Sequence, residues 1–252
     1  MPWFKRRVYI DWSLLLTIWI AVFAATVLRS FSGFGFALVA VPVLALFMPP
    51  VEVVVLSSAM AFTLSLLTVR SFSSVISLGE IKPLLLMSAA GTVLGVFILK
   101  LIPAELFQLC VGVAVLIACM GLMASGTPVS LHVRGLSWLA GLLSGLMNGA
   151  LAIPGPPIII YAMLTELDPI RSRALLMAFF LASSAFALIA YAVAGVIELQ
   201  SVKYYLLSMP ALVGGDWLGS RLFDRYGRSL YRKVALLALA ALGVSITLRA
   251  LL

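Results

Sequence analysis

Apolar residues dominate this chain in ten long runs, separated by short breaks that carry charged residues, proline or glycine. Inside a run such as Leu84–Leu99 the residues are apolar on every side of a helix. The strands of a membrane barrel would instead alternate apolar and polar residues. Most runs approach the ~20 residues that a helix needs to cross a bilayer. The pattern predicts an all-α integral membrane protein, a polytopic helical bundle of about 8–10 membrane segments.

The predicted segments follow one another along the whole chain. They cover residues 9–28, 33–48, 51–69, 83–101, 105–124, 135–151, 154–165, 173–197, 203–220 and 231–251. The second and seventh are short and follow glycine, serine or proline, so we interpret them as half-helices or re-entrant segments. The first run is too long for the apolar core of a signal peptide, which indicates a retained first helix.

Two halves of the chain, residues 1–124 and 135–252, resemble each other on either side of a linker over residues 125–134. Glycines and prolines recur at nearly constant spacing between them. The matches are Gly35 with Gly155, Pro49 with Pro169, and the Gly91–Gly95 motif with Gly215–Gly219. This spacing predicts two repeats of one transmembrane unit.

Basic residues between the segments indicate that the two halves have opposite orientations. Arg70 and Lys82 follow the third segment and Lys100 follows the fourth. In the second half the bias is reversed: Lys203 follows the eighth segment, and a basic cluster beginning at Arg221 follows the ninth. Since basic loops face the cytoplasm, the halves form an inverted-topology repeat, an architecture typical of secondary transporters. Strict alternation through ten spans would place residues 5–7, which are basic, outside, and the pattern leaves this conflict open.

The least regular stretches are Arg29–Gly35 and Asn148–Pro157, one in each half. Glycine and proline there would open the helix and leave backbone N–H groups unpaired, which a membrane tolerates only against protein or a water-filled cavity. A half-helix that starts after such a break directs its positive end at the cavity and favours a small anion. The candidate substrate-binding residues are Arg29, Ser30, Ser32, Gly33, Gly35, Asn148, Gly149, Pro154, Gly155 and Pro156. Alternatively, these small residues only allow close helix packing.

Ionisable residues and hydroxyls near membrane depth supply further candidates. Arg29 could attract an anion or extend its charge toward the interface. Asp216 is a candidate for proton coupling, although pairing with Arg221 or Arg225 is the favoured interpretation. A set of hydroxyls could line a pathway or bond between helices. Its members are Ser57, Ser58, Thr63, Ser183 and Ser184.

Composition excludes several classes of protein. Hydrophobic residues make up 63% of the 252 residues and charged residues only 10%, whereas soluble domains carry about 25% charged residues. The net charge of +8 comes from residues dispersed at segment ends, which indicates topology signals and no nucleic-acid partner. Cys110 and Cys119 share one apolar segment and His132 is the only histidine, so neither a disulfide framework nor a metal site is expected. Motifs of hydrolases and nucleotide-binding loops are absent from the sequence, so we expect no enzyme and no cofactor.

At the two breaks the sequence resembles the TauE/SafE family, the sulfite exporter family of membrane permeases. The resemblance lies in Ser32–Gly35 with Pro42, in Gly149–Pro157, and in the Gly-x-x-x-Gly helices at Gly91 and Gly215. It implies transport, often export, of small sulfur-containing or organic anions such as sulfite, sulfonates and carboxylates. Asp216 is not part of the family pattern.

We therefore expect a secondary transporter in the cell membrane that binds a small anion between the two breaks and works by alternating access. An anion channel and a non-transporting assembly factor are the alternatives. The expected partners are the anion and the lipid bilayer. The sequence also allows a homo-oligomer.

Overall fold

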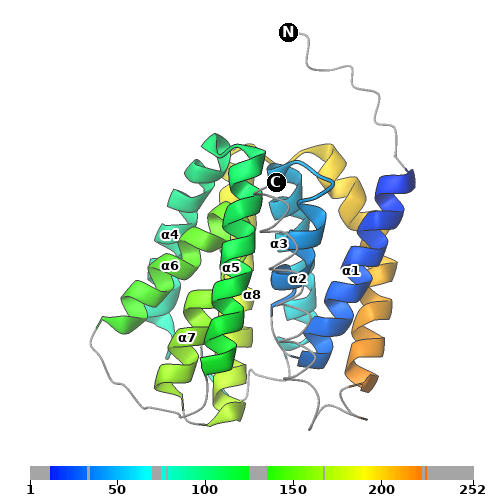
Figure 1. Ribbon diagram of the computed structural model, residues 1–252. Helices are drawn as coiled ribbons and strands as arrows, with labels where there is room; N and C mark the ends of the chain where they lie inside the picture. Colours follow the sequence, from blue (N-terminus) through cyan, green and yellow to red (C-terminus); the bar gives the residue numbers. More distant parts are fainter. Residues whose placement is uncertain are drawn as a thin grey trace.

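The computed structural model describes residues 12–32, 35–69, 75–77, 79–124, 135–166, 168–222 and 225, and its regular elements in these ranges are helices (Figure 1). In chain order they are α1 (Trp12–Ser32), α2 (Ala37–Leu44), α3 (Pro50–Leu67), α4 (Lys82–Leu101), α5 (Ala104–Ala124), α6 (Leu136–Leu151), α7 (Gly155–Thr165) and α8 (Pro169–Val193), followed by a helix over residues 199–222. The predicted all-α polytopic bundle is confirmed. The linker and the predicted segment 231–251 lie outside the described residues.

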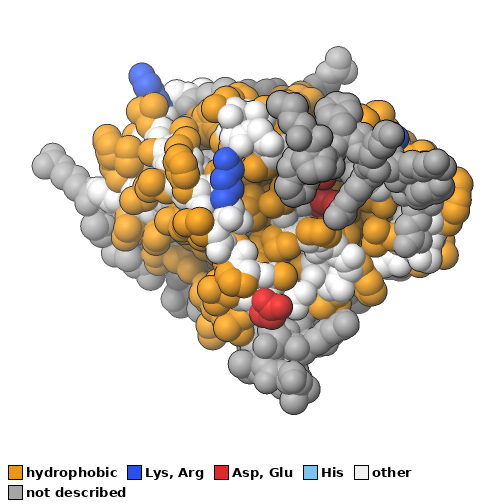
Figure 2. Space-filling model, turned by 90° about the horizontal axis from the view of Figure 1, so that it is seen from above, with side chains coloured by type: hydrophobic (Ala, Val, Ile, Leu, Met, Phe, Trp, Pro, Cys, Tyr) orange, Lys and Arg blue, Asp and Glu red, His pale blue; other side chains and the backbone are white. Residues whose placement is uncertain are grey.

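The outer surface of the bundle suits a lipid environment. Helices α1, α3, α4 and α8 are long and apolar enough to cross a membrane. Large apolar side chains point outward along them, for example Leu16, Phe97 and Ile189, each exposed over more than half of its surface. One end of the molecule shows only scattered charges among apolar side chains (Figure 2). The chain is therefore a multi-pass membrane protein.

Proline, glycine and one aspartate set the helix boundaries near the two breaks. Helix α3 begins at Pro50 and α8 at Pro169, positions where the missing N–H is no loss. Asp168 caps α8 by accepting a hydrogen bond from the Ile170 amide at 3.0 Å. Helix α8 therefore starts four residues before the predicted segment 173–197. As predicted, the helices after the breaks are short, with 8 residues in α2 and 11 in α7.

Helices α4 and α6 are packed backbone to backbone. A Cβ atom placed on Gly145 would lie 2.7 Å from both the Cα and the carbonyl carbon of Ser88. One placed on Gly95 would lie 2.7 Å from the Ala150 amide nitrogen. Real Cβ atoms essentially never come this close, so only glycine fits these positions. Without a hydrophobic driving force inside the bilayer, such close contact stabilises helix pairs by dispersion.

The helix over residues 199–222 makes a similar contact with α1, beside which it lies in Figure 1. A Cβ on Gly215 would lie 2.8 Å from the Phe23 carbonyl oxygen, and one on Gly219 would lie 2.6 Å from that of Val27. The Trp19 indole adds a 2.9 Å hydrogen bond to the Leu207 carbonyl. The first helix of each sequence half thus packs against a glycine-bearing helix of the other half.

Described basic residues gather mainly at one end of the bundle. Lys82 begins α4 and Arg171 lies in the first turn of α8, and both helices start at the lower end in Figure 1. Arg221 lies where the helix over residues 199–222 reaches the same end. Helix α1 begins at the opposite end, which agrees with strict alternation and not with a cytoplasmic amino end.

Candidate substrate-binding site

The two sequence breaks line one pocket inside the bundle. The space between its walls, including the part that opens outward, is about 470 Å³. The first break contributes Arg29 and residues 35–38, the second contributes Asn148 and residues 152–155, and the walls between them come from α3 and α8. The wall residues are Ser58, Ala61, Ser65, Phe180, Ser183 and Ser184. Stretches more than 110 residues apart therefore share one cavity, as expected for a single site.

Among the described residues that line the pocket, Arg29 is the one that carries a charge. It lies in the last turn of α1, its side chain is buried, and its Nη2 donates a hydrogen bond to the Thr68 hydroxyl at 3.2 Å. The ion pairs seen in the described part of the chain involve Arg171 and leave Arg29 without a carboxylate partner. A buried charge without a counter-ion is costly, so it marks a functional position.

Asn148 and the end of α6 are held in place by α8. The Asn148 side-chain amide donates to the Ser183 carbonyl at 2.7 Å. The Tyr191 hydroxyl lies within hydrogen-bond distance of the Asn148 and Gly149 carbonyls, at 3.0 and 3.1 Å. Helix α6 ends at Leu151, and the next residue, Ala152, has a left-handed backbone with φ of 56°. The Tyr191 hydroxyl thus serves the Gly149 carbonyl at this helix end, whereas the Asn148 carbonyl also accepts from the Ala152 amide at 2.8 Å.

The pocket hydroxyls differ in what they can offer a ligand. The Ser184 hydroxyl already donates to the Phe180 carbonyl of its own helix at 2.7 Å. The Ser58 hydroxyl is buried and has no hydrogen-bond partner among the described residues. It lies near the Tyr191 hydroxyl, without the geometry of a hydrogen bond. Ser58 is therefore the hydroxyl that a bound molecule could engage most directly.

The second break offers fewer amide donors than a helix start usually does. Pro154, Pro156 and Pro157 have no N–H group, so Gly155 and Ile158 supply the amide hydrogens of this turn. A Cβ on Gly155 would come within 3.2 Å of a Leu38 methyl carbon, so α7 and α2 face each other closely here. Side chains must therefore carry more of the binding than the sequence pattern implied.

The remaining candidates fall outside the pocket wall. Ser30 donates a hydrogen bond to the Asp216 carboxylate, and Gly149 packs against Thr92 of α4. Pro156 is buried in α7 without lining the cavity, Ser32 is the last residue of α1, and Gly33 lies outside the described residues. For Asp216, which was expected to pair with Arg221 or Arg225, the contact seen is the Ser30 hydrogen bond, while the Arg221 guanidinium stacks 3.9 Å over the Trp217 ring.

Sequence reasoning anticipated part of the pocket wall and missed the rest. Ser58, Ser183 and Ser184 were expected along a pathway and do line the pocket. Ser57 is buried without a partner among the described residues, and the Thr63 hydroxyl lies 2.8 Å from that of Tyr205. Phe36 and Phe180 were missed, as were Thr68 and Tyr191, which hold pocket residues in place. The polar atoms of Thr68 and Tyr191 inside apolar segments were the available signal.

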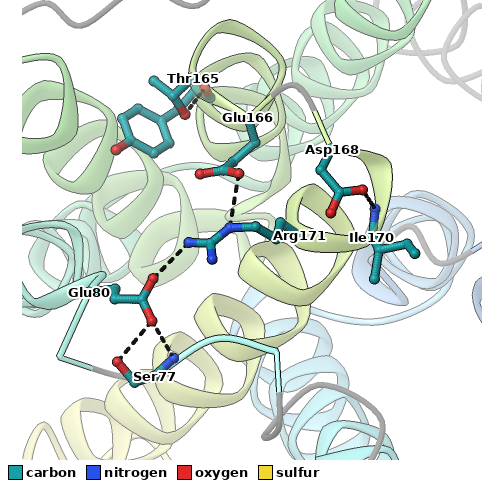
Figure 3. A network of polar contacts seen from close by, with 8 residues as sticks. Ser77, Glu80, Thr165, Glu166, Asp168, Ile170 and Arg171 are labelled. Atoms are coloured by element: carbon teal, nitrogen blue, oxygen red, sulfur yellow. Dashed lines mark hydrogen bonds and ion pairs between the residues drawn. The ribbon is translucent and has the colours of Figure 1, made fainter.

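A polar network lies at the end of the bundle where α7 finishes and α8 begins (Figure 3). Arg171 bonds Glu80 at 2.8 Å and Glu166 at 3.3 Å. Glu80 also accepts hydrogen bonds from the Ser77 amide and hydroxyl, both at 3.0 Å. The Ser77 amide, its hydroxyl and the Arg171 guanidinium hold the pKa of Glu80 below its usual range. The network connects the segment before α4 with both α7 and α8.

Comparison with known proteins identifies the family of this chain. A family model described as sulfite exporter TauE/SafE matches residues 18–246. The chain belongs to the TauE/SafE family. A curated relative, the probable sulfite/organosulfonate exporter TauE of Cupriavidus necator, is 27% identical over 167 residues. The match covers 64% of this chain and 64% of the relative, just under two thirds of the relative's length. No solved structure matches the chain.

Membership in TauE/SafE settles the general class of the protein. It is a multi-pass membrane protein of a family whose description names sulfite export. The resemblance seen at the two sequence breaks is confirmed by the family match over most of the chain.

Proposed function

We propose that this TauE/SafE protein is a secondary transporter that carries small anions such as sulfite, sulfonates or organic acids through the Arg29 pocket. The observation that carries the proposal is the buried Arg29 guanidinium, which faces a pocket built from both helix breaks and has no carboxylate partner among the described residues. A bound anion would supply the missing counter-charge. The name of the Cupriavidus relative supports sulfur-containing anions and export.

The pocket lining favours a singly charged anion with a small apolar group. Arg29 provides one positive charge, and the lining residues that the structure describes contain no carboxylate. Ser58 provides a hydroxyl donor, while Phe36, Leu38 and Phe180 present apolar surface. A second negative charge on the ligand would have no partner here and would cost desolvation free energy. A small sulfonate or carboxylate fits this combination.

Alternating access would follow from two repeats of opposite orientation, residues 1–124 and 135–252. The glycine contacts support this division, because Gly91 meets the α6 backbone as Gly215 meets the α1 backbone. They also suggest which bodies move. Helix α4 with α6 would form one rigid unit and α1 with the helix over residues 199–222 the other, since neither pair can slide without overlap of its backbones. The pocket lies between these two units.

The driving force is part of the proposal. Asp216 is the candidate for coupling transport to a proton gradient. The membrane potential is the alternative source of the driving force. Uptake into proteoliposomes with an imposed pH gradient, compared with an imposed potential, separates the two.

Transport of sulfite and methanesulfonate by purified protein in proteoliposomes tests the proposed function. We expect saturable uptake that an excess of unlabelled anion inside the vesicles accelerates, because a carrier exchanges substrate whereas a channel does not. The R29Q variant should lose at least about tenfold in kcat/KM, the loss expected when a charged hydrogen-bonding partner is removed. K82Q removes one positive charge from an exposed position at the same end and serves as the matched control. Equal transport by R29Q and wild type would refute the role of this pocket.

A further inference from the structure

Asp216 is fixed beside the end of α1, next to the anion pocket but outside its wall. Gly215 and Gly219, on either side of Asp216 in the sequence, meet the α1 backbone at Phe23 and Val27. This contact holds the carboxylate against Ser30, whose hydroxyl donates to it. Ser30 directly follows Arg29 in the sequence. The Asp216 carboxylate therefore lies beside the turn of α1 that carries Arg29.

The charges of Asp216 and Arg29 interact without forming an ion pair. Asp216 attracts the Arg29 guanidinium electrostatically, whereas Arg173 of α8 repels it. The Arg29 guanidinium is held instead by the neutral Thr68 hydroxyl, and the carboxylate by Ser30. Arg29 thus stays available to a ligand while part of its positive potential is compensated.

We propose that Asp216 is a positioning residue for transport, a fixed counter-charge that weakens anion binding at Arg29 and so allows the anion to be released. This inference rests on the proposed function. A carrier must bind its substrate well enough to load and weakly enough to unload, as a conducting site must. In a half-buried setting, a unit charge several ångströms away changes binding by about tenfold or more. The hydrogen bond from Ser30 keeps the Asp216 carboxylate from forming an ion pair with Arg29, where the substrate would bind.

Two substitutions separate the charge of Asp216 from its hydrogen bond. D216N removes the charge and keeps a side-chain oxygen that accepts from Ser30, so the Kd for sulfite and for methanesulfonate should fall about tenfold. S30A keeps the charge and frees the carboxylate to approach Arg29, so the same Kd should rise. Loss of structure would weaken binding in both variants, which makes the opposite signs diagnostic. E105Q neutralises an exposed carboxylate in the first turn of α5 and is the matched control, with unchanged Kd expected.

Binding is measured on the purified full chain by titration calorimetry, and transport in proteoliposomes. We expect D216N to lower both KM and kcat, because tighter binding slows release. An unchanged or raised Kd in a D216N protein that melts like wild type would overturn this inference and leave the transporter proposal standing. Failure of the wild-type protein to bind either anion would overturn both.

Discussion

The backbone contact between α4 and α6 makes a quantitative prediction for Gly145→Ala. The new Cβ would start 2.7 Å from two Ser88 backbone atoms, and ordinary contact begins at 3.4 Å. The two helices must therefore separate by at least about 0.7 Å, since the Ser88 carbonyl oxygen lies closer still and backbone cannot rotate away as a side chain could. A gap of this size costs a quarter to a half of the dispersion energy of nearby contacts.

The expected net loss of stability from Gly145→Ala is about 2 kcal/mol. Overpacking of this kind costs up to ~3 kcal/mol. Alanine returns ~1 kcal/mol through its higher helix propensity. At roughly 2–4 °C per kcal/mol for a chain of this size, the apparent melting temperature should fall by roughly 4–8 °C.

Gly214→Ala is the control for Gly145→Ala. Its Cβ would lie 3.7 Å from a Phe23 ring carbon, which is ordinary contact, so only the gain in helix propensity remains. Tryptophan fluorescence of the purified protein in detergent follows melting of both variants, and the transport assay follows function. A melting temperature for Gly145→Ala equal to that of wild type, or an equal loss in both variants, would show that the helix contact is looser than described.

Three further predictions concern polar contacts. Thr68→Val removes the hydroxyl that accepts a hydrogen bond from Arg29, so the KM for methanesulfonate should rise severalfold. Thr68→Ser keeps the hydroxyl and should have the KM of wild type. A raised KM in the serine variant would argue against a role of the hydroxyl. Tyr191→Phe leaves the Gly149 carbonyl without its hydroxyl donor, while the Asn148 carbonyl keeps the Ala152 amide, and should cost about 1–3 kcal/mol of stability, seen as a lower melting temperature. Because the pKa of Glu80 is lowered in the folded protein, its stabilising contribution is present above the pKa of an unfolded chain and is lost as the pH falls through the lowered value. The difference in melting temperature between wild type and E80Q should therefore vanish in acid, and a difference that persists there would contradict a charge-based contact with Arg171.

Local chemistry explains why most helix boundaries could be predicted from the sequence. Proline and glycine act within a few residues, so the starts of α3 and α7 at Pro50 and Gly155 were close to prediction. The start of α8 was placed four residues too late because Arg171 and Arg173 interrupt the hydrophobic pattern there. Both lie within the first turns of a helix that Asp168 caps, a signal that the hydrophobic pattern alone does not carry.

Contacts between distant segments account for what the sequence could not reveal. A stripe of glycines predicts that a helix packs closely but does not name its partner, so the pairing of α4 with α6 was missed. Ser30 and Asp216 are 186 residues apart, and nothing local in either segment indicates their hydrogen bond. Arg29 was found because it borders a break, whereas Phe180 of the same pocket lies inside an uninterrupted apolar run and carries no such mark.

The exchange of first helices between the halves has a consequence for the origin of the chain. If the two halves descend from one shorter gene, a single copy of that ancestor could not have covered its own glycine stripe with its own first helix. Two copies with opposite orientations in the bilayer would have had to exchange that helix, as the protomers of a domain-swapped dimer do. Fusion of the genes would then have made permanent an intertwined dimer that already existed. The two halves, expressed as separate polypeptides, should therefore still associate.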